Sequence, residues 1–232
     1  MEGNKSPEAI KQELFRVLKE HGAVLCGAAD MKGISPEGLE TGISVAVPVP
    51  KSIVRDLKTA PTEEYLRAYE SLNSRLNGIV TAGAEYLRQM GYRALPNTTD
   101  RVTVNEERCS PIPHKTFAVR AGLGWIGRNC LLITPEYGGA VRLSSLLTDA
   151  PLPTDEPCTE SRCGDCRLCA DACPAHALTG ALWQPGMPRA ELLDQETCYA
   201  CQLDRMETAT GIRSDLCGLC FAVCPYTENY IK

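Results

Sequence analysis

The sequence predicts an α+β protein with two domains, a mixed α/β domain over residues 1–150 and a small cysteine-rich domain over residues 151–232. Three observations predict this division. Segments of helical and strand period alternate through the first 150 residues. Residues 150–157, APLPTDEP, have the composition of a proline-rich linker. Ten of the thirteen cysteines then fall between Cys158 and Cys224.

The helices and strands of the first domain follow from capping residues and hydrophobic period. Ser6 and Pro7 predict the N-cap and first residue of a helix that Gly22 ends. Thr62 is expected to cap the longest periodic segment, a core-packing helix that runs to Gly91. Short apolar runs predict strands over residues 23–28, 42–47, 92–95, 131–134 and 141–147.

Composition and charge argue against several classes of protein. The formal net charge is −5 and no long basic block occurs, so we do not expect a large nucleic-acid-binding face. The first residues lack the apolar core of an export signal, and no apolar run is long enough to cross a bilayer. An odd number of cysteines in C-x2-C spacings argues against a disulfide framework. These features predict a cytoplasmic protein without a membrane partner.

The first cysteine cluster has the spacing of a bacterial ferredoxin. It is Cys163-x2-Cys166-x2-Cys169-x3-Cys173-Pro174. In such a run three thiolates bind one [4Fe–4S] cluster and the fourth binds the other cluster. Structural zinc sites use isolated C-x2-C pairs a dozen or more residues apart, which this compact run does not match.

The second cysteine cluster is incomplete. It is Cys217-x2-Cys220-x3-Cys224-Pro225. Ser214 stands where a full run would place its first cysteine, so the missing ligand is either Cys198 or Cys201. The crossover of fourth ligands assigns the first cluster to Cys163, Cys166, Cys169 and Cys224. The second cluster then takes Cys173, Cys217, Cys220 and one of Cys198 or Cys201.

The remaining cysteines have no place in these two sets. Cys158 and the unused member of the Cys198 and Cys201 pair are expected to be free thiols. Cys26 lies in an apolar strand and is expected to be a buried packing residue.

A glycine motif precedes the cysteine module. Gly122, Gly124 and Gly127 match G-x-G-x-x-G, but a dinucleotide site needs a helix that begins within the motif. Here a strand over residues 131–134 follows and Pro135 interrupts, which argues against that site. The glycines either let the backbone approach a large planar ligand or form a tight turn that packs on Trp125.

The motif and the module together resemble a known family. Residues 121–129, AGLGWIGRN, then residues 131–134 and the double-cluster module look like epoxyqueuosine reductases and their relatives, the reductive dehalogenases. The resemblance runs from about Val102 to Tyr226. It implies a nitroreductase-like α/β domain that holds a corrinoid and a cluster module that passes electrons to cobalt. The family also has a cysteine after a Leu-Asp dipeptide, which selects Cys198 because Leu193 and Asp194 precede it.

The resemblance also implies which residues would seat the corrin ring. The glycines would allow close approach, the tryptophan would give apolar contact, and the arginine and asparagine would bind the amide rim. These residues are Gly122, Gly124, Trp125, Gly127, Arg128 and Asn129. No histidine is placed to bind cobalt, so cobalamin is expected without a protein ligand to its metal.

Three departures from the family bear on the substrate. Arg108 stands where epoxyqueuosine reductases have an acidic residue thought to be the proton donor, and His114-Lys115 replaces a Glu-Arg pair. The family's C-terminal helical repeats, which help hold tRNA, have no counterpart after Asn229, and the chain is acidic. We therefore do not expect tRNA as the substrate. The candidate proton-transfer residues are Glu106, Glu107, Arg108, His114 and Tyr137, and a histidine can hold a proton near neutral pH.

The leading functional hypothesis is a corrinoid-dependent iron–sulfur reductase. Reduced ferredoxin or flavodoxin would supply electrons, which pass through two [4Fe–4S] clusters to cobalt and then to a small molecule or a corrinoid protein. The first alternative is an electron-transfer protein that reduces the cobalt of a partner corrinoid protein. The second alternative is an epoxyqueuosine reductase that acts on tRNA.

Overall fold

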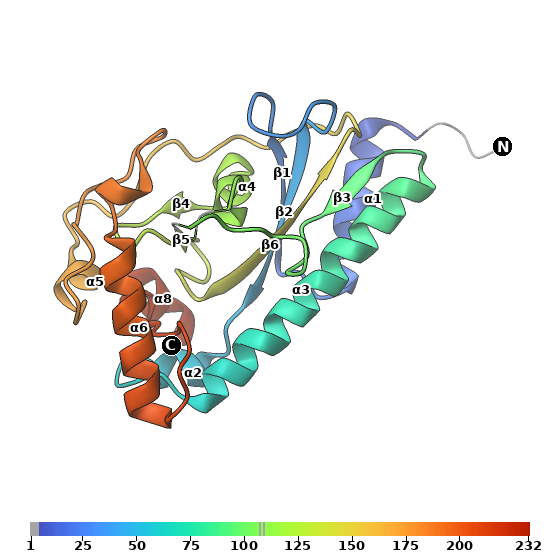
Figure 1. Cartoon of the computed structure of the whole chain (residues 1–232). Helices are drawn as coiled ribbons and strands as arrows, with labels where there is room; N and C mark the ends of the chain where they lie inside the picture. Colours follow the sequence, from blue (N-terminus) through green and yellow to red (C-terminus); the bar gives the residue numbers. More distant parts are fainter. Residues whose placement is uncertain (1–4, 107, 109) are drawn as a thin grey trace. The chain divides into compact units, whose positions relative to one another are not determined.

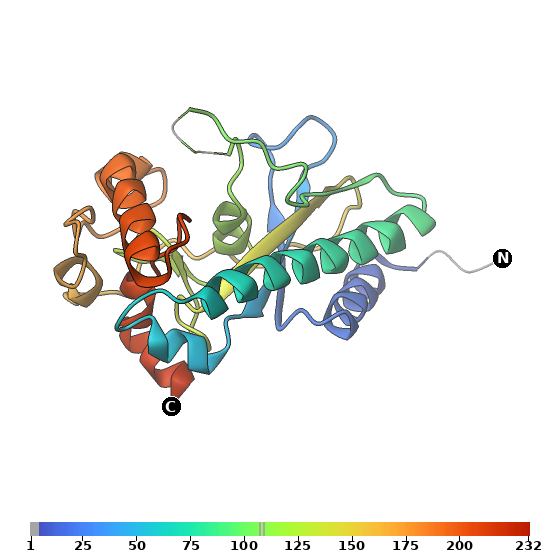
Figure 2. The same cartoon turned by 60° about the horizontal axis from the view of Figure 1, so that its bottom comes forward.

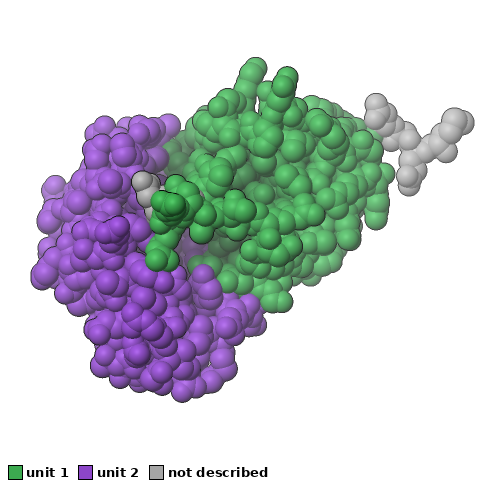
Figure 3. All heavy atoms as spheres, in the orientation of Figure 1, with its two compact units in different colours: residues 1–47, 73–123, 142–158 green, residues 48–72, 124–141, 159–232 purple. Residues whose placement is uncertain are grey.

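The computed structural model describes residues 5–106, 108 and 110–232, and these form two compact units (Figures 1 and 3). Unit 1 contains residues 1–47, 73–123 and 142–158, and unit 2 contains residues 48–72, 124–141 and 159–232. The units are therefore interleaved along the chain, whereas the sequence predicted one boundary near residue 150. Strand pairing explains the difference, because it joins segments far apart in sequence.

Unit 1 is built on a four-stranded sheet with the strand order β1-β2-β6-β3. The strands are β1 (Leu25–Asp30), β2 (Thr41–Pro48), β3 (Ala94–Pro96) and β6 (Val141–Thr148). β1 pairs antiparallel with β2, and β3 pairs antiparallel with β6. Each predicted strand of this sheet is present, with bounds shifted by one or two residues.

One face of this sheet is covered by α1 (Pro7–Glu20) and α3 (Glu63–Gln89). A Cβ on Gly83 of α3 would lie 2.7 Å from Leu18 of α1 and 3.1 Å from Leu146 of β6. The missing side chain therefore lets the two helices and the strand approach closely. Both helices begin as their caps predicted, since Ser6 accepts from the backbone N–H of Ala9 and Thr62 from that of Tyr65.

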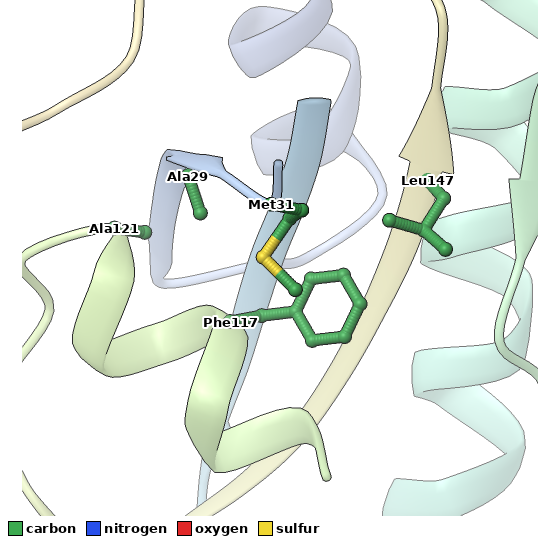
Figure 4. Packing of buried hydrophobic residues seen from close by; sticks show 5 residues of the cluster. All are labelled: Ala29, Met31, Phe117, Ala121 and Leu147. Carbon is green, nitrogen blue, oxygen red and sulfur yellow. The ribbon is translucent and has the colours of Figure 1, made fainter. Parts of the chain in front are cut away.

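The opposite face carries α4 (His114–Arg120). Phe117 of this helix is fully buried in a cluster with Met31 of the loop after β1 and Leu147 of β6 (Figure 4). Leu146 and Leu147 are consecutive in β6 and point to opposite faces, as the alternation of a strand requires. Figure 2 shows the sheet between its helical layers.

Unit 2 contains a small hairpin and several short helices. The hairpin pairs β4 (Trp125–Ile126) with β5 (Leu132–Ile133), so a strand follows the glycine motif where a dinucleotide site would have a helix. The helices are α2 (Lys51–Asp56), α5 (Leu168–Asp171), α6 (Gln195–Thr210), α7 (Leu219–Ala222) and α8 (Pro225–Ile231), with a 3-10 turn at Arg189–Glu191.

Residues 48–72 belong to unit 2 because they pack on its C-terminal helices. Arg55 of α2 donates to the carbonyl of Ile231, and Tyr65 meets Phe221 edge to face at 6.4 Å between ring centroids. Among the described residues, no helix has both the length and the apolar character needed to cross a membrane.

Candidate iron–sulfur centres

The two cysteine runs have the same local backbone structure. In each run a four-residue helix begins two residues after one cysteine and contains the next, so that Cys169 lies in α5 and Cys220 lies in α7. The N–H of Cys173 donates to the carbonyl of Ala170 at 3.2 Å, and that of Cys224 donates to the carbonyl of Phe221 at 3.2 Å. The two helices pack against each other. The half-repeats in the sequence are therefore also repeats in structure.

The four cysteines predicted for the first cluster line one cavity of about 140 Å³. They are Cys163, Cys166, Cys169 and Cys224. The rest of the lining consists of Gly127, Arg128, Asn129, Ile133, Pro225 and Tyr226. The crossover is visible here, because three of the thiols come from the first run and the fourth comes from the end of the second run. The ligand assignment stays a prediction, and this geometry supports it.

The thiols of this cavity influence one another. Burial, with smaller contributions from the neighbouring thiols of Cys163, Cys224 and Cys166, raises the pKa of Cys169 to about 11. Burial is also the main cause that raises the pKa of Cys224. Without a metal the thiols of Cys169 and Cys224 are therefore protonated near neutral pH, and binding of iron must displace these protons.

A second group of thiols surrounds Cys220. Burial raises the pKa of Cys220 well above its usual value, with further contributions from Cys217, Cys169, Cys198 and Cys173. Three of these four neighbours are the other ligands predicted for the second cluster. Cys169 is predicted for the first cluster, and it lies on α5, which packs against the helix α7 that carries Cys220.

Cys198 and Cys201 both lie on α6. Asp194 caps this helix by accepting from the N–H of Thr197 at 3.1 Å, and the spacing of three residues brings both cysteines to one side. Burial raises both thiol pKa values, and Cys173 and Cys217 act on both. Cys198 is the one that also acts on Cys220, which favours it as the fourth ligand.

The Cys198 thiol has an additional partner that the sequence did not indicate. The side-chain amide of Gln202 donates to its Sγ atom at 3.1 Å, one helical turn further along α6. Gln202 is neutral and belongs to no cysteine motif, so the sequence analysis did not single it out. The one sequence feature that indicates the contact is its position four residues after Cys198 on a helix.

The described residues contain no group of three His, Cys, Asp or Glu side chains placed to bind a single metal ion. Instead, the cysteines of the first group stand around a shared space. A cubane cluster requires this arrangement, because each thiolate binds a different iron atom at its own corner.

The residues of the glycine motif pack against other residues of the unit to which each belongs. A Cβ on Gly124 would lie 2.1 Å from the carbonyl oxygen of Ile133, and one on Gly127 would lie 2.7 Å from the Ile133 side chain. Trp125 is fully buried, and its ring meets that of Tyr226 edge to face at 4.8 Å. Gly122 belongs to unit 1 and has a φ of 69°. The contacts within unit 2 favour the tight-turn interpretation.

Arg128 and Asn129 bind the loops of the cysteine module. Arg128 donates to the carbonyl of Gly180 and, at 2.5 Å, to that of Gly164. Asn129 accepts from the N–H of Leu131 at 3.2 Å and donates to the carbonyl of Cys220 at 3.5 Å. The described contacts of these two residues are thus internal, and their role in corrin binding stays a prediction.

The candidate proton-transfer residues lie in different surroundings. His114 begins α4, and its Nδ1 lies 2.9 Å from the hydroxyl oxygen of Ser145. Burial, aided by the charge of Arg142, lowers the pKa of His114 to about 4, so the expectation that it holds a proton near neutral pH is wrong. Glu106 and Arg108 are exposed in the loop before α4, and Glu107 lies outside the described residues. Tyr137 belongs to unit 2, where its ring packs on Tyr230 at 5.1 Å.

Two other cysteines differ in surroundings. Cys26 in β1 is half-buried rather than fully buried, and desolvation raises its pKa to about 12, which fits a packing role. Cys158 ends unit 1, where its N–H donates to the carbonyl of Val119 at 2.9 Å.

The paired cysteine groups define the class of the protein, one with a double-cluster iron–sulfur domain. The family model described as 4Fe-4S double cluster binding domain matches residues 162–227. This match covers both cysteine runs and α6 between them.

The particular relatives are epoxyqueuosine reductases, which confirms the resemblance seen in the sequence motifs. The chain is 40% identical over 122 residues to the epoxyqueuosine reductase of Bacillus anthracis, a match that covers 50% of this chain and 30% of that protein. It is 39% identical over 119 residues to the enzyme of Bacillus subtilis and 33% identical over 128 residues to that of a Synechococcus strain. The matched segment thus spans about a third of the length of these relatives.

Solved structures share the fold over nearly the whole chain. A catabolic reductive dehalogenase aligns with 97% of this chain and 33% of its own, with a TM-score of 0.73 and 20% identity. An epoxyqueuosine reductase solved with a tRNA stem loop aligns with 94% of this chain and 65% of its own, with a TM-score of 0.58 and 21% identity.

Proposed function

We propose that this chain is an iron–sulfur reductase in which two [4Fe–4S] clusters carry electrons, one at a time, from a donor to an acceptor. The observation that carries the proposal is the cavity lined by four cysteines from both runs, within a segment that matches a double-cluster domain. When bound, such clusters supply reversible one-electron chemistry at low potential.

The chain's own residues would hold the two clusters side by side. Cys169 and Cys220 lie on the packed helices α5 and α7, and the Cys169 thiol contributes to the pKa shift of Cys220. Cys173 ends the first run but is assigned to the second cluster, and Cys224 ends the second run but is assigned to the first cluster. This crossed arrangement would keep the path between the two clusters short.

The leading acceptor in this proposal is a corrinoid. Its support is similarity, because a reductive dehalogenase of the same fold is described with a mechanism for B12-dependent dehalogenation. Three of the six residues expected to seat the corrin have internal contacts. Trp125 is fully buried, and Arg128 and Asn129 bind backbone groups of the module. The assignment of all six residues to the corrin stays a prediction.

Metal analysis tests the iron–sulfur part of the proposal. Anaerobically reconstituted protein should contain about eight irons and eight acid-labile sulfides per chain, as two [4Fe–4S] clusters require. Stoichiometric zinc with little iron would overturn it. Addition of cobalamin under reducing conditions, followed by absorption and electron paramagnetic resonance spectra, tests the corrinoid part. Bound cobalamin together with turnover of an electrophile supports the reductase.

A second candidate function is electron transfer to a separate corrinoid protein. The internal contacts of Trp125, Arg128 and Asn129 favour this second function, because these side chains already contact other residues of the chain. In this case reduced ferredoxin or flavodoxin would reduce the clusters, while added cobalamin would not bind. The name of the curated relatives supports a third candidate function, reduction of epoxyqueuosine in tRNA. Conversion of epoxyqueuosine to queuosine within the tRNA by the reduced, purified protein would establish it.

A further inference from the structure

Arg128 occupies a distinctive place in the first-cluster cavity. It lies two residues after the end of β4 and is the lining residue that carries a positive charge at neutral pH. Two of its terminal N–H groups donate to the carbonyls of Gly180 and Gly164, and Gly164 comes immediately after Cys163. The guanidinium is therefore held in place by the loop that carries a predicted ligand.

The third nitrogen of this guanidinium has no such partner. Arg128 Nε is buried, and its N–H donates to no protein group among the described residues. A buried N–H donor without an acceptor loses its hydrogen bonds to water and gains none in return, so native proteins seldom retain one. Of the buried unpartnered side-chain atoms in the described part of the chain, Arg128 Nε is the one whose residue lines the cavity.

Cluster sulfur is the acceptor that this cavity would provide. Four cysteine thiolates and the sulfides of a cubane would fill it with negative charge, and a guanidinium donates strong, charge-assisted hydrogen bonds. A cation and an N–H donor next to the cluster stabilise its reduced form more than its oxidised form, because reduction adds one electron. Reduction of a bound cluster would neither form nor break a bond to the cysteines.

We infer that Arg128 donates a hydrogen bond from Nε–H to the first cluster and thereby raises the reduction potential of that cluster. This inference rests on the proposed iron–sulfur function. The second cluster has a neutral donor instead, the Gln202 amide on Cys198 Sγ. A charged donor is roughly twice as strong as a neutral one, so an electron that enters the module rests preferentially on the first cluster.

The test compares reduction potentials of the fully loaded protein. In Arg128→Met, electron paramagnetic resonance during a redox titration should show one of the two clusters shifted to lower potential. The ratio of reduced to oxidised cluster at a fixed potential should fall about tenfold, which for one electron is about 59 mV. Arg128→Lys keeps the charge and should shift less.

Arg167→Met is the matched control. Arg167 also donates to the Gly180 carbonyl, at 3.3 Å, but its side chain is half-exposed and lies outside the cavity lining. Its loss should leave both potentials unchanged. If Arg128→Met cannot be loaded with iron, the Arg128→Lys variant is the test. Cluster reduction potentials in Arg128→Lys equal to those of the wild-type protein would then refute the inference.

Two results would overturn the inference while leaving the iron–sulfur proposal intact. In the first, Arg128→Met retains about eight irons and both wild-type potentials. In the second, the same variant retains both potentials but loses cobalamin binding, which would return Arg128 to the corrin. Failure of the wild-type protein to bind iron would instead refute the proposed function itself.

Discussion

His114 shows how burial decides the charge of a single residue. Its Nδ1 interacts with the Ser145 hydroxyl, which is also bound by the Asn97 side-chain amide at 2.9 Å. Nδ1 thus has a hydrogen-bond partner, but the loss of water and the positive charge of Arg142 oppose protonation of the ring. A histidine that the sequence presented as a candidate acid is therefore a neutral structural residue near pH 7.

The lowered pKa of His114 predicts a loss of stability in mild acid. Its folded value of about 4 lies below the ordinary 6.5, so the unfolded chain binds more protons between these values. The His114 contribution to stability is full above pH 6.5 and is lost as the pH falls towards 4. Between about pH 7.5 and 5.5 the free energy of unfolding should fall by roughly 1 kcal/mol from this residue. Urea unfolding of unit 1 measures it, and His114→Gln should show a smaller pH dependence. An unchanged dependence in that variant would contradict the prediction.

The choice between Cys198 and Cys201 is also decided by individual residues. Cys198→Ser should reduce the iron content from about eight to about four per chain, because one cluster loses a ligand. Cys201→Ser is the matched change one helical turn away and should keep nearly all of its iron. Iron and sulfide analysis after anaerobic reconstitution checks both. Loss of iron from the Cys201 variant alone would reverse the assignment.

At the scale of elements, the β4–β5 hairpin connects the glycine motif to the cluster cavity. Gly124 fits against the Ile133 carbonyl, and Ile133 in turn lines the cavity. The glycine is needed here because the two strands approach too closely for any side chain. The hairpin therefore serves the first cluster directly.

Gly124→Val should damage the hairpin and with it the first cluster. A Cβ placed 2.1 Å from the Ile133 carbonyl oxygen must displace backbone. We expect iron to fall by up to half, measured by metal analysis. Gly78→Ala is the control, because a Cβ there has no neighbour within 4 Å, and it should stabilise α3 by roughly 0.5–1 kcal/mol. Full iron in Gly124→Val would show that the hairpin tolerates the change.

At the scale of the whole molecule, the two units depend on different forces. Unit 1 has a sheet with buried helices on both faces, including the cluster around Phe117. In unit 2, α5 and α7 have four residues each, far fewer than an isolated helix needs. Metal binding therefore has to supply much of the stability of the cysteine module.

Removal of iron should loosen unit 2 and leave unit 1 largely folded. After chelation under oxidising conditions, amide hydrogen exchange should speed up over residues 159–232, while β1, β2 and β6 keep their protection. The protected amides of these strands serve as the internal reference within each sample. Equal loss of protection in both units would mean that the clusters stabilise the whole chain.

Local sequence patterns were enough to predict the two long helices of the first domain, its strands and the grouping of the cysteines. Caps such as Ser6 and Thr62 act on neighbouring N–H groups, and strand patterns reflect alternation along the chain, so both are local. Cysteine spacing is informative for the same reason, because three thiolates of one run must reach a single cluster.

The contacts of Gly124, Arg128 and His114 could not be predicted from the sequence, because they form only when the chain folds. Each acts through contacts with residues far away in sequence, namely Ile133, Gly180 and Ser145. Burial then sets the outcome, since it removes water from the His114 ring and from the Arg128 Nε atom. Spacing along a chain carries no information about such desolvation, because distant segments create it when they pack together.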